Sequence, residues 1–290
     1  MAKSVYIGVS DKAREVKKMY IGVNGVARKV KKAYIGVNGV ARLFYSGFPE
    51  EPTEYVLGWT YTSSTTFTAP EDGYYQIELF GKSGSGGTGE TGFTTYKNNA
   101  GTTYSQHGAW NASGGGGGSG AYCCSRGIKL NKGDTVFIDI DEDCTVEITS
   151  STDESYSVMK CTAGSDGGSG SYSKGTTNSS WGTVYGGSAG KGGVASGGNA
   201  VNTNGKDGTA GSGSMTKKVQ GSLSSISGGA GGSAPYTGAN AGGKGGTAPA
   251  ITVKANSSDT RYSQITSGGG SNDGSSGSTG VCKIYRGNTN

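Results

Sequence analysis

The feature that most limits what this chain can fold into is its glycine, which is concentrated in residues 81–280. That stretch holds 49 of the chain's 58 glycines, in clusters such as 114–118, 167–168 and 268–270. Collagen requires Gly at every third position and abundant Pro, whereas the spacing along this chain is irregular and only five prolines occur. A collagen triple helix is therefore excluded.

Two alternatives remain for this glycine-rich region. One is a flexible linker, because Gly/Ser-rich segments behave as random coil, although Tyr, Trp and Val recur between the clusters. The other is a bundle of polyglycine II helices, which have three residues per turn and satisfy their backbone groups by hydrogen bonds between helices. Glycine's conformational entropy opposes such a bundle, so it needs a folded frame that fixes its ends.

Charge is unevenly distributed along the chain. Residues 1–45 carry ten Lys/Arg and two acids, a net of +8, and the remainder carries sixteen and nineteen, a net of −3, which together give +5. This split favours a basic docking segment on a nearly neutral body over a nucleic-acid-binding domain. No stretch approaches the ~18 apolar residues of a membrane-spanning helix, and residues 1–10 lack the apolar core of a secretory signal. We therefore expect synthesis in a cytoplasm and release by lysis or within an assembly.

Residues 6–45 contain three copies of one unit at a period of 14. The Asn-Gly pairs at 24–25 and 38–39, between apolar runs, predict type I′ hairpins with Ile21, Val23 and Val26 on one face. Such a unit is too small to bury its apolar face alone. We expect an anchoring module; a β-meander with a solvated basic face and a nucleic-acid-binding element are alternatives. The expected anchoring residues are Tyr6, Arg14, Tyr20, Arg28, Tyr34 and Arg42.

The rest of the chain has the alternation of strands. Tyr75, Ile77 and Leu79 fall on one face of a predicted strand at 74–80, and the runs at 65–70, 120–125, 135–140, 145–149 and 281–285 are similar. We therefore predict an all-β chain in three parts: β-hairpin repeats in residues 1–47, a proline-containing linker in 48–54, and, in 55–290, a jelly-roll-like β-sandwich that frames a polyglycine II bundle. The cysteines lack a C-x-x-C spacing, so we expect small buried hydrophobic residues at Cys123, Cys124, Cys144, Cys161 and Cys282.

Three parts of the sequence resemble known families. The run from Phe67 through Gly84 and the later run from Gly118 to Thr135 are similar to glycine-rich β-sandwich domains of bacteria and phages and to the glycine-rich domain of the anaplastic lymphoma kinase receptor family. The Tyr-Ile-Gly-Val-Asn-Gly-Val-Ala-Arg repeat resembles N-terminal repeats of phage and prophage structural proteins from Gram-positive gut bacteria. The glycine clusters resemble the tip adhesins of T-even-like phage tail fibres, although here the runs are shorter and Ser, Thr and Asn interrupt them.

Sequence motifs for catalysis and cofactors are incomplete. Residues 84–89 match G-x-G-x-x-G, but no helical pattern follows, so we expect no bound cofactor. The single histidine, His107, has no G-x-S-x-G motif to accompany it and is expected in a loop or on the surface. The acids Asp139, Asp141 and Asp143 resemble the start of a calcium loop, but Cys144 and Ser150 stand where an EF-hand needs Gly and Glu. They are expected on the polar face of a strand, with a calcium site as the lesser alternative.

Aromatic residues within Gly/Ser/Asn-rich loops are candidates for recognition. Tyr combined with Ser, Gly and Asn is typical of adaptable binding surfaces, and the alternative is that these rings cap the ends of the glycine bundle. The candidates are Tyr96, Tyr104, Trp110, Tyr172, Trp181, Tyr185 and Tyr236.

These features and resemblances predict a phage virion protein without enzymatic activity. The resemblance to tail-fibre tips implies an adhesin that binds a bacterial surface polysaccharide or protein without catalysis and gains avidity by linking several weak sites. It also implies a homotrimer, docking on other virion proteins through the N-terminal repeats, and no nucleic-acid or membrane partner. A head fibre or a capsid or neck decoration protein is one alternative, and a cell-wall polysaccharide depolymerase is another.

Overall fold

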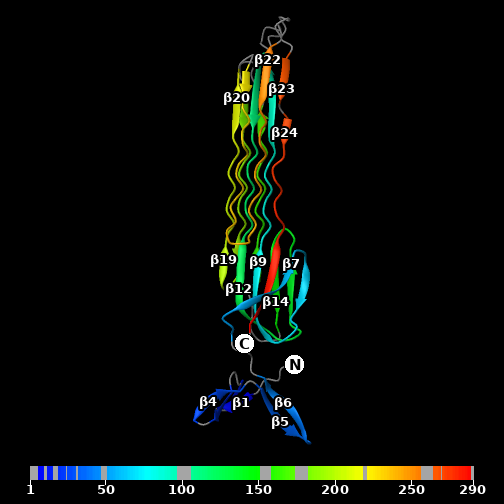
Figure 1. Cartoon of the computed structure of the whole chain (residues 1–290), viewed down its shortest axis with the longest axis vertical. Coiled ribbons are helices and arrows are strands. Elements are labelled where there is room, and N and C mark those ends of the chain that lie inside the picture. Colours follow the sequence, from blue (N-terminus) through cyan, green and yellow to red (C-terminus); the bar gives the residue numbers. More distant parts are fainter. Residues whose placement is uncertain are drawn as a thin grey trace.

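The structure is a computed structural model that describes residues 6–9, 12–15, 19–23, 25–30, 32–46, 51–96, 106–150, 158–173, 182–217, 221–255, 264–268 and 270–288. These residues form an elongated all-β molecule, which confirms the predicted class (Figure 1). N-terminal hairpins lie at one end. A β-sandwich, a bundle of glycine-rich segments and a distal group of strands follow along the length of the molecule.

The N-terminal repeats form three separate two-stranded hairpins. The turn of the third hairpin is of the predicted type, because Asn38 and Gly39 both have positive φ (52° and 77°), as a type I′ turn requires. Val23 pairs with Val26 as predicted, which places Ile21 and the two valines on one face. The hairpins consist of β1 (Tyr6–Val9) with β2 (Lys12–Glu15), β3 (Tyr20–Val23) with β4 (Val26–Lys29), and β5 (Lys32–Val37) with β6 (Val40–Ser46).

Two five-stranded antiparallel sheets make up the sandwich. The first has the order β19 (Val201–Thr203), β12 (Tyr122–Leu130), β9 (Gly73–Phe80), β25 (Val281–Gly287) and β7 (Tyr55–Tyr61). The second has the order β18 (Ala195–Ser196), β15 (Met159–Cys161), β14 (Cys144–Thr149), β13 (Thr135–Asp139) and β8 (Thr65–Thr68). The C-terminal strand β25 thus lies between β9 and β7 and closes the first sheet.

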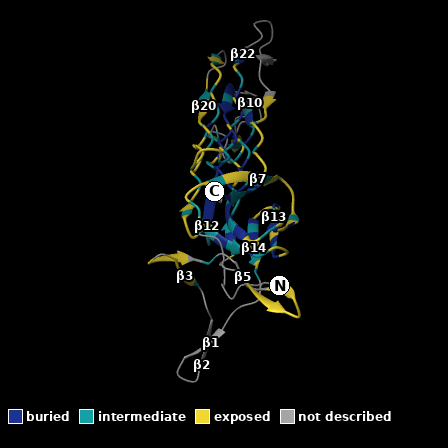
Figure 2. Cartoon of the chain, turned by 60° about the horizontal axis from the view of Figure 1, so that its bottom comes forward, coloured by how far each residue is buried: buried dark blue, intermediate teal, exposed yellow. Residues whose placement is uncertain are grey.

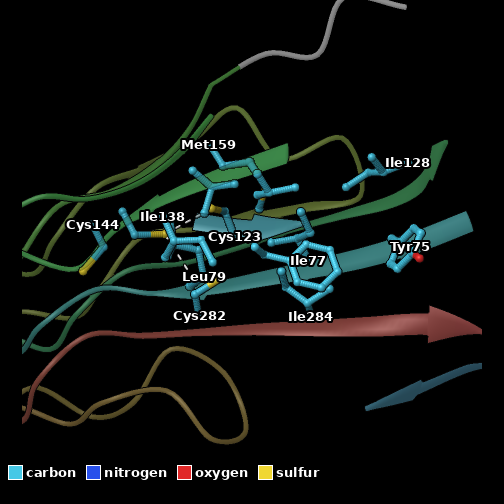
Figure 3. Packing of buried hydrophobic residues seen from close by; sticks show 14 of the residues in the cluster. Tyr75, Ile77, Leu79, Cys123, Ile128, Ile138, Cys144, Met159, Cys282 and Ile284 are labelled. Carbon is cyan, nitrogen blue, oxygen red and sulfur yellow. Dashed lines mark hydrogen bonds between the residues drawn. The ribbon is translucent and has the colours of Figure 1, made fainter. Parts of the chain in front are cut away.

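Side chains from both sheets fill the sandwich interior (Figure 3). Tyr75, Ile77 and Leu79 of β9 are fully buried, as their alternation predicted. Ile138 of β13 and Met159 of β15 face them from the second sheet. Burial of each large aliphatic side chain contributes about 1.5–3 kcal/mol, so this core is the main source of hydrophobic stabilisation in the sandwich.

All five cysteines are buried and reduced, which confirms their expected role as small core residues. Cys123 of the first sheet and Cys161 of the second meet across the core, with their sulfur atoms 3.1 Å apart. Burial raises the pKa of the Cys144 thiol to about 11, because a thiolate loses its hydration inside the core. The Cys144 thiol therefore stays neutral near neutral pH.

The distal strands form two further sheets and a hairpin. One sheet has the order β20 (Gly213–Thr216), β11 (Gln106–Ala112), β10 (Gly89–Tyr96) and β24 (Gly270–Asn272). The other consists of β21 (Gly221–Leu223), β22 (Ile251–Ala255) and β23 (Gln264–Gly268), and the hairpin of β16 (Ser171–Ser173) and β17 (Thr183–Tyr185). A small core of Ala109, Leu223 and Ile251 joins β11 to the distal three-stranded sheet of β21, β22 and β23.

Part of the expected linker lies against the sandwich. The carbonyl of Glu54 accepts a hydrogen bond from the N–H of Asn288 at 3.0 Å, and Pro52 lies close over Gly287. Residues 47–50 are outside the described residues. Burial falls from the sandwich interior to the second and third hairpins, whose described residues are mostly exposed (Figure 2).

Candidate functional site

Eight glycine-rich segments connect the sandwich to the distal strands, and we call them together the glycine lattice. Each one joins a strand or turn of the sandwich end to the distal group, and they run alternately toward and away from the distal end. A nine-residue segment with a rise of about 3.1 Å per residue spans roughly 28 Å. The central segment is 113–121, the ring segments are 81–88, 162–170, 186–194, 204–212, 227–232 and 239–247, and the outer segment is 273–280.

The central segment is hydrogen-bonded to all six ring segments. Every backbone N–H from Ser113 to Gly120 donates to a ring carbonyl at 2.8–3.1 Å. Ser113, Gly116 and Ser119 donate to segment 204–212, the residues after each of these donate to 239–247, and Gly115 and Gly118 donate to 162–170. The other three ring segments donate to its carbonyls at 2.8–2.9 Å. Partners therefore recur every third residue, which is the repeat of polyglycine II.

Glycine recurs at every third position within the individual segments. The spacing is irregular along the whole chain, but segment 186–194 has Gly187, Gly190 and Gly193 facing the central segment, and segment 204–212 has the same period. In the central segment all three positions of each turn face neighbours, which explains the longest glycine run, 114–118. A methyl group added at Gly116 would overlap the carbonyl of Ala230. Glycine is therefore required at the positions where the backbones of neighbouring segments come too close for a side chain.

Serine, threonine and aspartate interrupt the glycine runs for a physical reason. Their side-chain oxygens accept hydrogen bonds from backbone N–H groups of the next segment. Ser119 is fully buried in the central segment, and its Oγ accepts from the N–H of Lys206 at 2.6 Å. Asp207 accepts from the N–H of Gly192 at 2.9 Å, and the pKa of its carboxyl is lowered mainly by its hydrogen bond from Lys191. The interruptions thus add acceptors where a pure glycine segment would have none.

The predicted recognition residues do not gather in one place. Tyr96 ends β10, and Tyr104 and Trp181 lie outside the described residues. Trp110 stacks on Tyr172 with ring centroids 5.3 Å apart. The indole also lies against Gly92, so close that an added Cβ there would be 2.7 Å from Cζ2. This pair packs the β16–β17 hairpin onto β11.

Tyr185 and Tyr236 lie at opposite ends of the glycine lattice. Tyr185 of β17 is an exposed residue of the distal group. Tyr236 lies in the turn between segments 227–232 and 239–247, where it stacks on Tyr122 of the sandwich at 4.2 Å. Tyr236 therefore holds this turn against the sandwich, whereas Tyr185 is available for contacts at the distal end.

A carboxylate on the outer face of the first sheet was not singled out in the sequence. Glu78 accepts hydrogen bonds from the hydroxyls of Tyr122 at 3.1 Å and Tyr285 at 2.6 Å. Burial, followed by the hydrogen bond to Glu78, raises the pKa of Tyr285. Burial also raises the pKa of Tyr122. Both phenols therefore stay protonated and can donate to the carboxylate. The alternation of β9 places Glu78 outward, but only the fold brings the two tyrosines to it.

The predicted anchoring residues occupy equivalent places in the hairpins. Tyr20 and Tyr34 are exposed at the start of their repeats. Arg14, Arg28 and Arg42 stand directly across the strand pair from an isoleucine of the same hairpin. The side chains of Tyr6 and Arg14 are outside the described set, although their strand register is described.

The predicted calcium residues have other partners. The hydroxyl of Ser64 donates to Asp139 at 2.8 Å, and Asp143 forms an ion pair with Lys160 at 2.8 Å. The backbone N–H of Asp141 donates to Asp139 at 3.1 Å. Within the described part of the chain, no group of three or more His, Cys, Asp or Glu residues is placed to hold a metal ion.

The remaining motif residues lie in strands or in the glycine lattice. Residues 84–89, which match the dinucleotide motif, run through ring segment 81–88 into β10. His107 lies in β11 opposite Thr95, and its side chain is outside the described set. The described residues include no helix that is long and apolar enough to cross a membrane.

Neither the family models nor the curated proteins searched gave a match to this chain.

Proposed function

We propose that this chain is a bacteriophage virion protein, specifically a tail-fibre or tail-tip adhesin that binds the bacterial surface without catalysis. The observation that carries the proposal is the glycine lattice with its central segment bonded to six neighbours. Such a rod holds the distal strands at a fixed distance from the sandwich. The basic hairpins are at the opposite end (Figure 1), and the second and third of them carry exposed aliphatic and tyrosine side chains. Separation of a docking end from a presenting end is what an adhesin needs.

The distal strands support this proposal because they are paired as hairpins. The ends of β10 and β11, of β16 and β17, and of β22 and β23 flank residues 97–105, 174–182 and 256–263. Several connections of this kind on one rigid support favour multivalent recognition. The receptor would be a surface polysaccharide or protein, and the virion would be released by host lysis.

Homotrimer formation is a separate part of the proposal. All six neighbours of the central segment come from the same chain, so a trimer would not be needed to complete the lattice. Light scattering of the purified chain measures its mass directly, and a mass of three chains supports the trimer.

Incubation of the purified chain with cell walls of the host bacterium tests the adhesin function. Wild-type protein is expected to sediment with the walls and to release no reducing sugar. Replacement of residues 97–105 by a Gly/Ser segment of equal length is expected to weaken sedimentation, with the circular dichroism spectrum retained. Release of reducing ends would instead support a depolymerase, and absence of binding would favour a head fibre or a capsid or neck decoration protein. Cryo-electron microscopy of the particle locates the chain on tail or capsid.

A further inference from the structure

The three N-terminal hairpins are equivalent in register as well as in sequence. Each places a Tyr-Ile-Gly-Val strand against its return strand so that the isoleucine pairs with an arginine and the glycine with an alanine. The isoleucine–arginine pairs are Ile7 with Arg14, Ile21 with Arg28 and Ile35 with Arg42. The repeat therefore preserves a surface and not only a backbone shape.

The surfaces of the second and third hairpins are exposed to nearly the same extent. Ile21 and Ile35 are 56% and 54% exposed, and Val26 and Val40 are both 59% exposed. An isolated two-stranded hairpin is marginally stable in water. Exposed aliphatic residues at matching positions in both copies therefore indicate a partner that covers each copy in the same way.

The charge of this segment points to the nature of the partner. Residues 1–45 have a net charge of +8, and Arg28 and Arg42 are exposed beside the aliphatic residues. A second copy of the segment would bring like charges together, which opposes association. An acidic protein surface with apolar depressions complements both properties.

The connections between the hairpins limit how far apart their binding sites lie. Two residues separate Lys29, which ends β4, from Lys32, which begins β5, so these ends are at most about 11 Å apart. Four residues separate Glu15 from Tyr20, which allows at most about 18 Å. Sites occupied at the same time must therefore be nearest neighbours on the partner.

We infer that one chain binds three adjacent, identical acidic sites on a virion protein that is itself repeated, with one hairpin in each site. This inference rests on the proposed virion function and specifies its docking end. Linking three weak sites by short connections raises the overall affinity by about 10²–10⁴-fold over a single site. The first hairpin carries Lys12 where the others carry Val26 and Val40, so it contributes the least apolar contact.

The test is binding of the full chain to particles assembled without it. Ile21→Asp and Ile35→Asp are each expected to raise the apparent Kd by ~10-fold or more, the double variant to raise it further, and Ile7→Asp to raise it less. Val194→Asp is the matched control, since Val194 is an exposed aliphatic residue outside the hairpins, and it should leave Kd unchanged. Affinity should fall as NaCl is raised from 0.05 to 0.5 M.

Charge variants provide a second test in case the aspartate substitutions unfold a hairpin. Arg28→Gln and Arg42→Gln preserve the aliphatic face and are expected to weaken binding equally and to reduce its dependence on salt. The inference would be overturned if variants in one hairpin abolished binding while the equivalent variants in the other hairpins had no effect. Binding that does not depend on salt would also overturn it. If the purified chain forms oligomers by itself and Ile21→Asp dissociates them, the hairpin surface binds a second copy of the chain instead of a virion protein. If wild-type chain fails to bind the particles at all, the virion function itself is overturned.

Discussion

The sandwich and the glycine lattice are built from the same continuous stretches of chain, but their interiors are filled in opposite ways. Strand β9 leads directly into segment 81–88, and segments 113–121 and 273–280 lead directly into β12 and β25. In the sandwich, side chains such as Ile77 and Ile138 fill the space between two sheets. In the lattice, Gly116 has no side chain, and the backbones of neighbouring segments occupy that space themselves. A chain can therefore form a solid interior either by adding side chains or by omitting them.

The two regions depend on one another. The lattice orders glycine, whose loss of conformational entropy on folding is the largest of any residue, and it buries little apolar surface in return. The sandwich and the distal sheets hold both ends of its segments. We therefore expect one cooperative unfolding transition for both regions, and variants in each region test how the interiors differ.

The largest effect is expected from a side chain placed inside the lattice. In Gly116→Ala, the new methyl group overlaps the carbonyl of Ala230, and the six surrounding segments leave it no direction in which to relax. We expect destabilisation on the order of 5 kcal/mol or loss of the folded state, measured by urea denaturation. Gly58→Ala is the matched control, because the nearest atom to its methyl group would be the Ile284 carbonyl at 3.7 Å. Equal tolerance of both substitutions would contradict the close-packed backbone interior.

Removal of a side chain from the sandwich core is expected to have the next largest effect. Ile138 is fully buried, and Ile138→Ala leaves a cavity that costs about 2–5 kcal/mol. Thermal unfolding followed by circular dichroism should show one transition at a lower temperature. Two separate transitions, with only one of them shifted, would show that the lattice does not depend on the sandwich. Phe137→Ala, on the exposed face of the same strand, is the control.

A smaller effect is expected from a hydroxyl within the lattice. Ser119→Ala keeps a β-carbon that the structure already accommodates but removes the acceptor for the N–H of Lys206. The contact is part-buried and Lys206 is an exposed residue, so we expect the loss of one ordinary hydrogen bond, about 0.5–1.5 kcal/mol. Hydrogen exchange at the Lys206 amide should accelerate more than at amides of the sandwich. Unchanged exchange and stability would indicate that the serine is only a spacer.

The smallest effect is expected from the titration of a buried thiol in the sandwich core at alkaline pH. The pKa of Cys144 is raised by burial from 9.0 to about 11, so the folded state favours the neutral thiol. Its contribution to stability is complete below pH 9 and is lost as pH rises toward 11. Wild-type protein should therefore lose more stability than Cys144→Ala between pH 8 and pH 11, as measured by urea midpoints. Equal losses would show that this thiol does not contribute to the alkaline response.

The sequence predicted the all-β class and the local elements, because alternation and turn residues are short-range signals. The buried positions of Tyr75, Ile77 and Leu79 and the turn at Asn38-Gly39 follow from neighbouring residues alone. The three-residue period of glycine was also present in the sequence, but its segments are separated by distal hairpins, so a count over the whole chain makes the spacing irregular. Counting within each segment would have found it.

Contacts between distant residues were the part that the sequence did not predict. Tyr236 was grouped with the candidate recognition loops, yet it stacks on Tyr122 at the sandwich end. Trp110 and Tyr172 come from different segments and meet only because β11 and the β16–β17 hairpin are held side by side. Aromatic residues in Gly/Ser-rich sequence look alike whichever end of a segment they occupy, and only the direction of each segment separates them.

The three-residue repeat of the lattice has a consequence for its length. Moving one glycine segment along its axis by three residues brings every backbone group back opposite an equivalent partner, so the bonds within the rod do not by themselves define an alignment. Alignment comes from the strands at both ends and from hydroxyl contacts such as that of Ser119. A rod of this kind can be extended in steps of about 9 Å by inserting three residues into every segment. The reach of the molecule is therefore a quantity that evolution or design can change without altering either end.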